Sequence, residues 1–486
     1  MRKLNTLSLI EASEALQKKE ISSEELTRAC LSAIKEKDST IHAFLTVTDE
    51  HALTTARDID RRRANGERLG PLAGIPFAIK DIFATQGVRT TAASKILEEY
   101  VPPYDATVVA KLKEQGIVIL GKTNLDEFAH GASTENSAFG PTKNPLDTER
   151  VPGGSSGGSA AALAADMCIA ALGTDTGGSI RQPAAFCGVV GIKPTYGRVS
   201  RYGLLSMTSS TDVVGPMTKT VTDAAVVLEA IAGEDGHDAT TTAKPVLNYR
   251  SYLEHASVKG LRIGVPREYF ISGMQPEIEQ RVRAALNAYE KLGATLVDIA
   301  LPHTQYAIPV YYIVTPSEVS SNLGRYDGIR YGYSECRMQN AECRNLEAVY
   351  SLSRAHGFGP EAKRRIMIGT YALSHGYYDA YYLQAAKVRT LIRRDFEEVF
   401  KKVDVIMTPT SPNVAFKIGE KTGDPLQLYL EDVLLAAVSL AGLPAISIPC
   451  GKGAHNMPVG LQIIGNYFEE EKILSAAYIY EQTTTH

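Results

Sequence analysis

The stretch PGGSSGGSAAALAA, residues 152–165, is followed ten residues later by DTGGSIRQPAAF, residues 175–186. Each stretch contains a Gly-Gly-Ser turn, with Ser155 in the first and Ser179 in the second, and no histidine lies between them. A glycine-rich turn that ends in serine is found in phosphate-binding loops, at nucleophilic serines and in flexible connections. The residues around the two turns must therefore decide which chemistry they support.

The chain around these turns has the sequence pattern of an α/β protein. Short apolar runs separated by Gly and Pro begin near residue 70, and they include GIPFAIKDIF, GIVILGKT, AALGTDTGGSI and GVVGIKP. Helical segments alternate with them, which favours a central β-sheet covered by helices on both faces. We expect one large domain over 1–486, made of a helical rim (1–60), a core (61–240), the remaining sheet with substrate-binding helices (241–481) and a disordered tail (482–486).

Composition excludes several classes of protein. The 51 basic and 55 acidic residues leave a formal charge of −4, so no global basic field would hold a nucleic acid. Six cysteines form no CxxC pair, and the closest two, Cys336 and Cys343, are seven residues apart, which predicts reduced thiols and no metal site. The N-terminus resembles no targeting peptide and no long apolar run is present, so we expect a cytoplasmic protein.

Two motifs point to chemistry that their surroundings do not support. GIVILGKT (116–123) satisfies the phosphate-loop pattern, but its four variable residues are apolar and predict a buried strand instead of an open loop. The pattern G-x-S-x-G occurs in two registers, centred on Ser155 and Ser156, yet the upstream NPLDTERVP is no apolar strand. A late histidine, His455, is the remaining candidate for a Ser-His-Asp triad, and its loop context favours a solvated residue.

A serine nucleophile without histidine needs another base, and Lys80 is the candidate. It ends the apolar run GIPFAIK, where burial would disfavour the ammonium form and lower the pKa of the amine. The simpler interpretation is a lysine at a strand end paired with Asp81. The amides of Thr176, Gly177, Gly178 and Ser179 could converge as an oxyanion hole, while Ser155 could relay a proton.

These segments resemble the amidase signature family. GGSSGGSAA (153–161) and GTDTGGSIRQPAAFCGVVGIKPTYGRVS (173–200) are similar to its signature, and PLAGIPFAIKD (71–81) is similar to its lysine strand. The resemblance covers nearly the whole chain and implies a single amidase domain with a mixed sheet. It also implies a Ser-cisSer-Lys triad, with Ser179 as nucleophile, Ser155 as relay on a cis peptide and Lys80 as base.

Within the family, residues 320–333 and 357–392 are similar to the A subunit of tRNA-dependent amidotransferases. This resemblance implies a glutaminase that supplies ammonia for converting Glu-tRNA(Gln), Asp-tRNA(Asn) or both. It implies a heterotrimer with B and C subunits, in which the B subunit uses ATP and Mg²⁺ and binds most of the mischarged tRNA. No cofactor is expected on this chain. The alternatives are a free-standing amidase acting on small or aromatic amides and a catalytically silent scaffold.

Glutamine would need a cation for its α-carboxylate and an anion for its α-ammonium. The resemblance assigns these roles to Arg365 and Asp432, with Tyr311 beside them, and Arg364 is the competing arginine. On a helix, the Arg365 face also carries small residues that would leave room for a ligand: Ala362, Gly369 and Ala372.

The chain departs from the family pattern near the expected substrate pocket and ammonia route. His130 and Ala132 stand in DEFAHGAS, where the family pattern resembles DEF-(A/G)-M-G-S-S. Val213 replaces a usual Gln, and the segment before Leu440 lacks the usual Thr pair and Asn. These departures bear on amide specificity and on coupling to the partner, whereas the triad residues match the family pattern.

Overall fold

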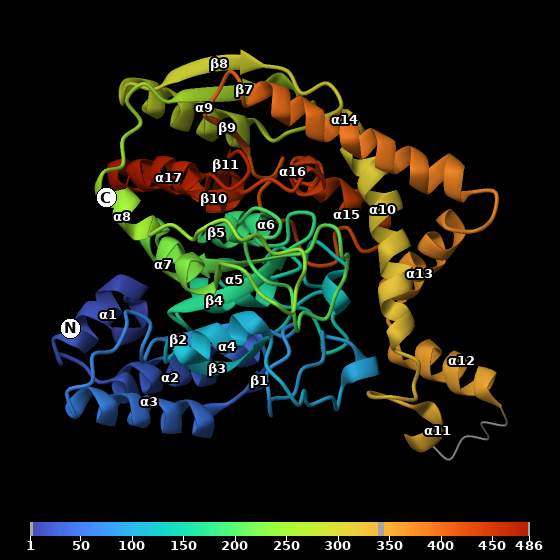
Figure 1. The fold of residues 1–486 in the computed structure, drawn as a ribbon, viewed down its shortest axis with the longest axis horizontal. Coiled ribbons are helices and arrows are strands. Elements are labelled where there is room, and N and C mark those ends of the chain that lie inside the picture. The colour runs from blue at the N-terminus through green and yellow to red at the C-terminus, as the bar shows by residue number, and fades with distance from the viewer. Residues whose placement is uncertain (1–2, 339–344, 485–486) are drawn as a thin grey trace.

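A computed structural model describes residues 3–338 and 345–484. Its centre is a sheet of 11 strands in the order β1-β3-β2-β4-β6-β5-β10-β11-β9-β7-β8, which runs through the molecule from bottom to top in Figure 1. The strands are β1 Phe44–Val47, β2 Pro76–Lys80, β3 Val118–Thr123, β4 Ala170–Asp175, β5 Val190–Lys193, β6 Val213–Thr218, β7 Arg262–Pro266, β8 Thr295–Ile299, β9 Val405–Pro409, β10 Ala445–Lys452 and β11 Pro458–Ile464.

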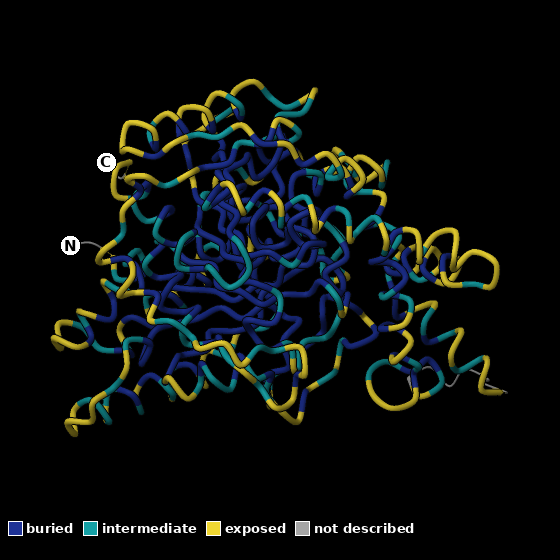
Figure 2. Tube along the Cα trace, turned by 45° about the horizontal axis from the view of Figure 1, so that its top comes forward, coloured by how far each residue is buried: buried dark blue, intermediate teal, exposed yellow. Residues whose placement is uncertain are grey.

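The sheet is mixed, as expected for this α/β fold. Strand β2 pairs in parallel with both β3 and β4, whereas β4 pairs antiparallel with β6. Every residue of β2, β3, β4 and β6 is buried, so helices and loops cover both faces of the sheet there. Figure 2 shows this buried interior surrounded by exposed loops and helix edges.

Helices surround the sheet, and several follow boundary signals that the sequence contains. Ser22 and Glu25 form the expected capping box at the start of α2, and Thr220 caps α7. The helices are α1 Leu9–Gln17, α2 Ser23–Ile41, α3 Asp49–Ala64, α4 Thr107–Glu114, α5 Gly157–Ala164, α6 Arg181–Cys187, α7 Val221–Ile231, α8 Tyr249–Glu254, α9 Pro276–Lys291, α10 Ala307–Asn322, α11 Glu335–Met338, α12 Leu346–Gly357, α13 Pro360–Ala372, α14 Gln384–Val399, α15 Pro425–Tyr429, α16 Ala436–Ala441 and α17 Glu470–Thr484.

The phosphate-loop pattern is a buried strand, as its apolar residues predict. Lys122 lies at the end of β3, where its ammonium donates hydrogen bonds of 2.7 Å to the Phe83 carbonyl and 2.7 Å to Thr90 Oγ1. Asp81 forms an ion pair with Lys122 at 3.4 Å. Asp81 is therefore the partner of Lys122 and not, as the simpler interpretation had it, of Lys80.

Helices α10, α13 and α14 form a wall on one side of the sheet, at the right in Figure 1. A Cβ atom on Gly369 would lie 1.8 Å from the Pro316 carbonyl oxygen, so glycine allows α13 to approach α10 closely. Ala362 and Ala372 are also buried. The expectation that this face leaves room for a ligand is wrong at Gly369, because the backbone of α10 occupies the space.

Three further expectations concern the C-terminal tail, the cysteines and membrane-spanning helices. The predicted tail of 482–486 is helical as far as Thr484, because α17 continues past its buried Tyr480, and 485–486 lie outside the described residues. Cys336 is disulfide-bonded, so the prediction of reduced thiols is wrong there, while Cys30, Cys168, Cys187 and Cys450 are free and buried. No helix in the described ranges is long and apolar enough to cross a membrane.

Candidate active site

Lys80 ends β2 inside a ring of three hydroxyl groups. Its Nζ lies 2.7 Å from Ser155 Oγ, 2.9 Å from Ser156 Oγ and 2.8 Å from Thr174 Oγ1, and its side chain is fully buried. Because β2 and β4 pair in parallel, Lys80 and Thr174 both lie at the carboxyl ends of these neighbouring strands. The first Gly-Gly-Ser turn supplies the other two hydroxyls.

Burial changes the acid–base chemistry of this lysine. Removal of the ammonium from water lowers the pKa of Lys80 to about 7, although the carboxylates of Asp126, Asp212 and Asp175 oppose this effect. Three neutral hydroxyls stabilise the ammonium less than one paired carboxylate would. Near neutral pH the amine is therefore available as a general base.

The two serines of the first turn differ in their hydrogen bonds. Ser156 Oγ donates to the Thr174 carbonyl at 3.1 Å and accepts from the Thr174 amide at 3.2 Å, so its proton is committed to β4. Ser155 Oγ forms a hydrogen bond with Lys80 and with no other described residue, and the Gly154–Ser155 peptide bond is cis. Of these two serines, Ser155 is therefore the one whose hydroxyl proton is free to pass between Lys80 and a neighbour.

The second turn packs directly onto the first. The Ser156 amide donates to the Ser179 carbonyl at 3.1 Å, and Gly178 has a φ of +146°, a backbone conformation that favours glycine. Within the described residues, the amides of Thr176, Gly177, Gly178 and Ser179 donate no hydrogen bond. Unpaired amides beside a serine hydroxyl are suited to stabilising an oxyanion.

Buried charges hold this turn in place from both ends. Asp175 accepts hydrogen bonds from the Ile180 amide at 3.2 Å and from Arg181 Nη2 at 2.8 Å. At the other side, Thr176 Oγ1 donates to Asp212 at 2.7 Å. Both carboxylates are buried, so their loss would leave unpaired polar groups around the turn.

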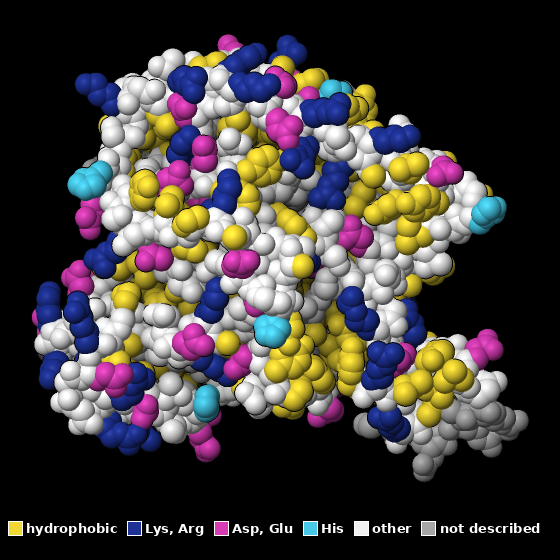
Figure 3. Space-filling model, in the orientation of Figure 1, with side chains coloured by type: hydrophobic (Ala, Val, Ile, Leu, Met, Phe, Trp, Pro, Cys, Tyr) yellow, Lys and Arg dark blue, Asp and Glu magenta, His cyan; other side chains and the backbone are white. Residues whose placement is uncertain are grey.

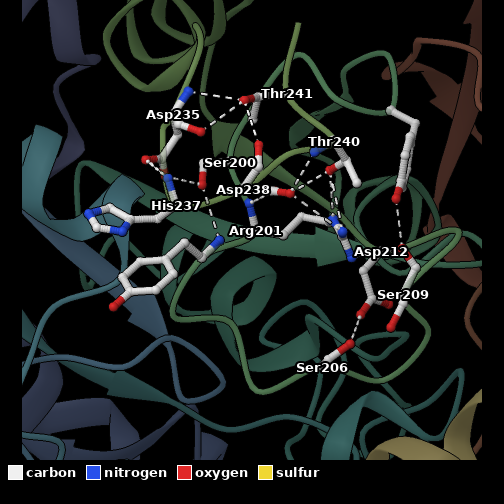
Figure 4. Close-up of polar contacts among 12 residues, drawn as sticks. Ser200, Arg201, Ser206, Ser209, Asp212, Asp235, His237, Asp238, Thr240 and Thr241 are labelled. Carbon is white, nitrogen blue, oxygen red and sulfur yellow. Dashed lines mark hydrogen bonds and ion pairs between the residues drawn. The ribbon is translucent and has the colours of Figure 1, made fainter.

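Figure 4 shows the network that supports Asp212 from the neighbouring loops. Ser206 Oγ donates to Asp212 at 3.2 Å. Arg201 Nη1 donates to the Ser209 carbonyl at 2.7 Å, and the Arg201 amide donates to Asp238 at 2.8 Å. These hydrogen bonds attach the loop that carries Asp212 to residues 235–241. They hold Asp212 in position to accept the hydrogen bond from Thr176.

Arg365 points inward from α13, whereas Arg364 points outward. Their side chains are 3% and 43% exposed, respectively. Arg365 Nε donates to Glu361 at 2.8 Å, and its guanidinium lies over the rings of Tyr312 at 5.3 Å and Tyr429 at 5.4 Å. No described residue accepts a hydrogen bond from the two terminal nitrogens of Arg365, which leaves them for an external anion.

Asp432 and Tyr311 connect Arg365 to the second turn. Asp432 accepts a hydrogen bond from Tyr312 at 3.1 Å, and burial raises the pKa of its carboxyl to about 7. Tyr311 lies against the turn, since a Cβ atom on Gly177 would be 2.5 Å from its hydroxyl oxygen. Leu435, just after Asp432, would be 2.4 Å from a Cβ on Gly178. Because Gly177 and Gly178 have no Cβ atom, Tyr311 and Leu435 can pack directly against the second turn.

The structure brings Lys80 into contact with Ser155, packs the turn of Ser179 on that of Ser155, and places Tyr311 against Gly177. It adds residues that sequence reasoning missed: Ser156 and Thr174 around Lys80, and Glu361, Tyr312 and Tyr429 around Arg365. Two of these residues could have been found from the sequence. Ser156 is adjacent to Ser155, and Glu361 is four residues from Arg365 on one helix. His455 is an exposed residue, unlike the buried Ser155 and Ser156, so no Ser-His-Asp triad forms through it.

The structure also shows where three of the residues that depart from the family pattern lie. His130 and Ala132 lie in the buried loop after Phe128, and a Cβ on Gly154 would be 2.9 Å from the Ala132 carbonyl carbon. Val213 begins β6, directly after Asp212, and is buried. Ala132 therefore borders the first turn, and Val213, which pairs with Asp175 in the sheet, lies beside the second. The described part of the chain contains no group of three or more His, Cys, Asp or Glu side chains arranged to hold a metal ion.

Comparison with known proteins identifies the class of protein to which this site belongs. The chain matches the Amidase family over residues 25–474, and it belongs to that family.

Proteins with more specific names also resemble the chain. The A subunit of glutamyl-tRNA(Gln) amidotransferase from Moorella thermoacetica is 58% identical over 480 residues, which cover 99% of this chain and 97% of that protein. The crystal structure of the Thermotoga maritima protein of the same name is 44% identical, with a TM-score of 0.81 over 99% of this chain and 95% of that one. A peptide amidase from Stenotrophomonas maltophilia is 32% identical, with a TM-score of 0.81 over 98% and 96% of the two chains.

Proposed function

We propose that this chain is the glutamine-hydrolysing A subunit of a tRNA-dependent amidotransferase. The observation that carries the proposal is the fully buried Lys80, 2.7 Å from Ser155, beside a serine turn whose amides donate to no described residue. The inward-facing Arg365 and the buried Asp432 supply the two charges that an amino-acid amide requires. Two relatives that carry the name of this A subunit are 58% and 55% identical, whereas the peptide amidase is 32% identical.

In the first chemical step, Ser179 Oγ attacks the carboxamide carbon of glutamine. Its proton passes to Ser155 Oγ while the proton of Ser155 passes to the lone pair of neutral Lys80. The amides of Thr176 to Ser179 stabilise the negative oxygen of the tetrahedral intermediate.

Collapse of this intermediate breaks the carbon–nitrogen bond. The leaving nitrogen takes the proton back from Lys80 through Ser155 and departs as ammonia, and a γ-glutamyl ester remains on Ser179. Water then attacks the ester by the same proton route in reverse, which releases glutamate and restores the serine. No metal or cofactor on this chain takes part in these steps.

The substrate is held at its α-carbon. Arg365 pairs with the α-carboxylate, Asp432 pairs with the α-ammonium, and Tyr311 packs beside them against Gly177. Two charged contacts at one end orient the carboxamide at the other end toward Ser179, which removes much of the entropic cost of reaching the transition state.

The remaining chemistry belongs to partners. We propose a cytoplasmic heterotrimer in which a B subunit uses ATP and Mg²⁺ to activate Glu-tRNA(Gln), Asp-tRNA(Asn) or both, with a C subunit joining the pair. The net charge of −4 and the intermixed acidic and basic side chains on the face in Figure 3 fit a chain that leaves most tRNA contacts to a partner.

The test is to purify the chain with its native partners and measure glutamine hydrolysis with and without them. We expect co-purification with two other chains and glutaminase activity in that complex. A chain that purifies alone and hydrolyses small or aromatic amides in preference to glutamine would instead be a free-standing amidase. A three-chain complex that transfers free ammonia but never hydrolyses glutamine would make this chain a scaffold.

Replacing Arg365 by Gln should raise the KM for glutamine strongly. Loss of one partner of a buried charged contact costs about 3 kcal/mol, which corresponds to roughly a hundredfold in kcat/KM. The matched control is Arg364→Gln, because that side chain is 43% exposed and should change KM by less than about twofold. Equal losses in both variants, measured by steady-state glutaminase kinetics, would remove Arg365 as the carboxylate clamp.

A further inference from the structure

Thr134 lies between β3 and α5 in a backbone conformation that is unusual for threonine. Its φ of +62° is in the left-handed region, where a branched Cβ is strained. Such a conformation costs about 1 to 3 kcal/mol, and residues that keep it cluster at functional sites. Glycine or asparagine would adopt this backbone more easily. The reason for a threonine at this position must therefore lie in its side chain.

The Thr134 hydroxyl bridges the two ends of the first Gly-Gly-Ser turn. Its Oγ1 donates to the Gly153 carbonyl at 2.8 Å and accepts from the Gly157 amide at 3.1 Å. The threonine is fully buried, so bulk water would not replace either hydrogen bond. The two glycines flank the pair of serines whose hydroxyls contact Lys80. One hydroxyl group therefore holds the turn both before and after these serines.

Asp126 fixes the backbone of Thr134 and also packs on the turn. Its Oδ2 accepts a hydrogen bond from the Thr134 amide at 2.9 Å, and its Oδ1 accepts from the Asn136 amide at 3.1 Å. The same carboxylate lies against the turn, since a Cβ atom on Gly154 would be 2.2 Å from Oδ2. Asp126 is fully buried. The loop that carries Thr134 is therefore held in one place relative to the turn.

We propose that Thr134 is a positioning residue, whose hydroxyl holds the first turn so that Ser155 can relay the proton to Lys80. This inference rests on the proposed function. Glycines give the turn little stiffness of its own, so hydrogen bonds from outside must fix its geometry. A proton relay requires each hydroxyl to stay within hydrogen-bond reach of its neighbours. A displacement of about 1 Å in such a site can reduce the rate about a hundredfold.

The test compares three variants of Thr134 in the assembled complex. Thr134→Val keeps the shape of the side chain but removes both hydrogen bonds, and we expect kcat for glutamine hydrolysis to fall about tenfold to hundredfold. The KM for glutamine should change less than about twofold, because Arg365 and Asp432 are unaltered. Thr134→Ser keeps the hydroxyl and should retain kcat within about threefold. Thr134→Gly relieves the backbone strain, so it should fold readily and still lose as much kcat as the valine variant.

The matched control is Thr142→Val. Thr142 is a fully buried threonine whose hydroxyl donates to the His42 carbonyl at 2.8 Å and accepts from Asn124 at 3.0 Å, and neither partner belongs to the two turns. Its loss should lower thermal stability by a similar amount and leave kcat within about threefold of wild type.

The outcomes separate this inference from the function on which it depends. An unchanged kcat in Thr134→Val and Thr134→Gly, an equal loss in Thr142→Val, or a serine variant as impaired as the valine variant would overturn the inference. Ammonia-dependent amide transfer by each variant complex reports correct assembly, and its loss in both Thr134→Val and Thr134→Gly would assign the residue a purely structural role. A wild-type complex without glutaminase activity would instead overturn the proposed function.

Discussion

Replacing Ser179 by Ala should abolish glutamine hydrolysis and leave ammonia-dependent amide transfer intact in the assembled complex. The serine is the only group of this chain that forms a covalent bond to the substrate carbon in the proposed mechanism. Removal of such a nucleophile costs at least about 10⁴-fold in kcat in serine hydrolases. Free ammonia enters after this step, so transfer to the tRNA no longer depends on Ser179. Ammonia release from glutamine and amide transfer from ammonium chloride measure the two activities separately.

The control for this variant is Ser159→Ala. Ser159 is also a buried serine of the first turn's helix, but its hydroxyl contacts Thr123 Oγ1 at 2.7 Å and the Leu172 carbonyl at 2.9 Å and forms no hydrogen bond with Lys80. Its loss should cost about 1 kcal/mol of stability and leave the glutaminase rate within a few-fold of wild type. Glutaminase activity that survives in Ser179→Ala would exclude Ser179 as the nucleophile.

Local signals in the sequence predicted much of the fold and the chemistry. The apolar residues of GIVILGKT excluded a phosphate loop, and β3 is indeed a buried strand. The absence of a nearby histidine directed attention to Lys80, whose burial at the end of β2 follows from the apolar run before it. Signals of this kind depend on neighbours in the chain, which the sequence displays directly.

Contacts between distant segments were harder to predict. The hydroxyl of Thr174 reaches Lys80 because β2 and β4 pair in parallel, and no local pattern specifies that register. The small residues near Arg365 were interpreted as space for a ligand, but at Gly369 the space holds the backbone of α10. Absence of a side chain indicates close approach of some group. Whether that group is a ligand or a helix depends on the tertiary structure.

Replacing Lys80 by Ala should prevent formation of the acyl-enzyme. Lys80 Nζ is the only basic nitrogen that contacts Ser155 among the described residues, and loss of a general base costs about 10² to 10⁴-fold. We therefore expect no burst of ammonia in the first turnover, measured by rapid quench with excess glutamine. Lys80→Arg should be equally inactive, because a guanidinium keeps the positive charge but does not release its proton near neutral pH.

The pH profile of the wild-type enzyme provides the matching test of the base. Burial lowers the pKa of Lys80 to about 7, so the protonated and inactive form accumulates as the pH falls below that value. The rate constant kcat should fall about tenfold per pH unit below 7 and level off above about 8, provided that chemistry limits turnover. A normal burst in Lys80→Ala, or substantial activity in Lys80→Arg, would show that the three hydroxyls act without this amine, and the role of base would pass to another group.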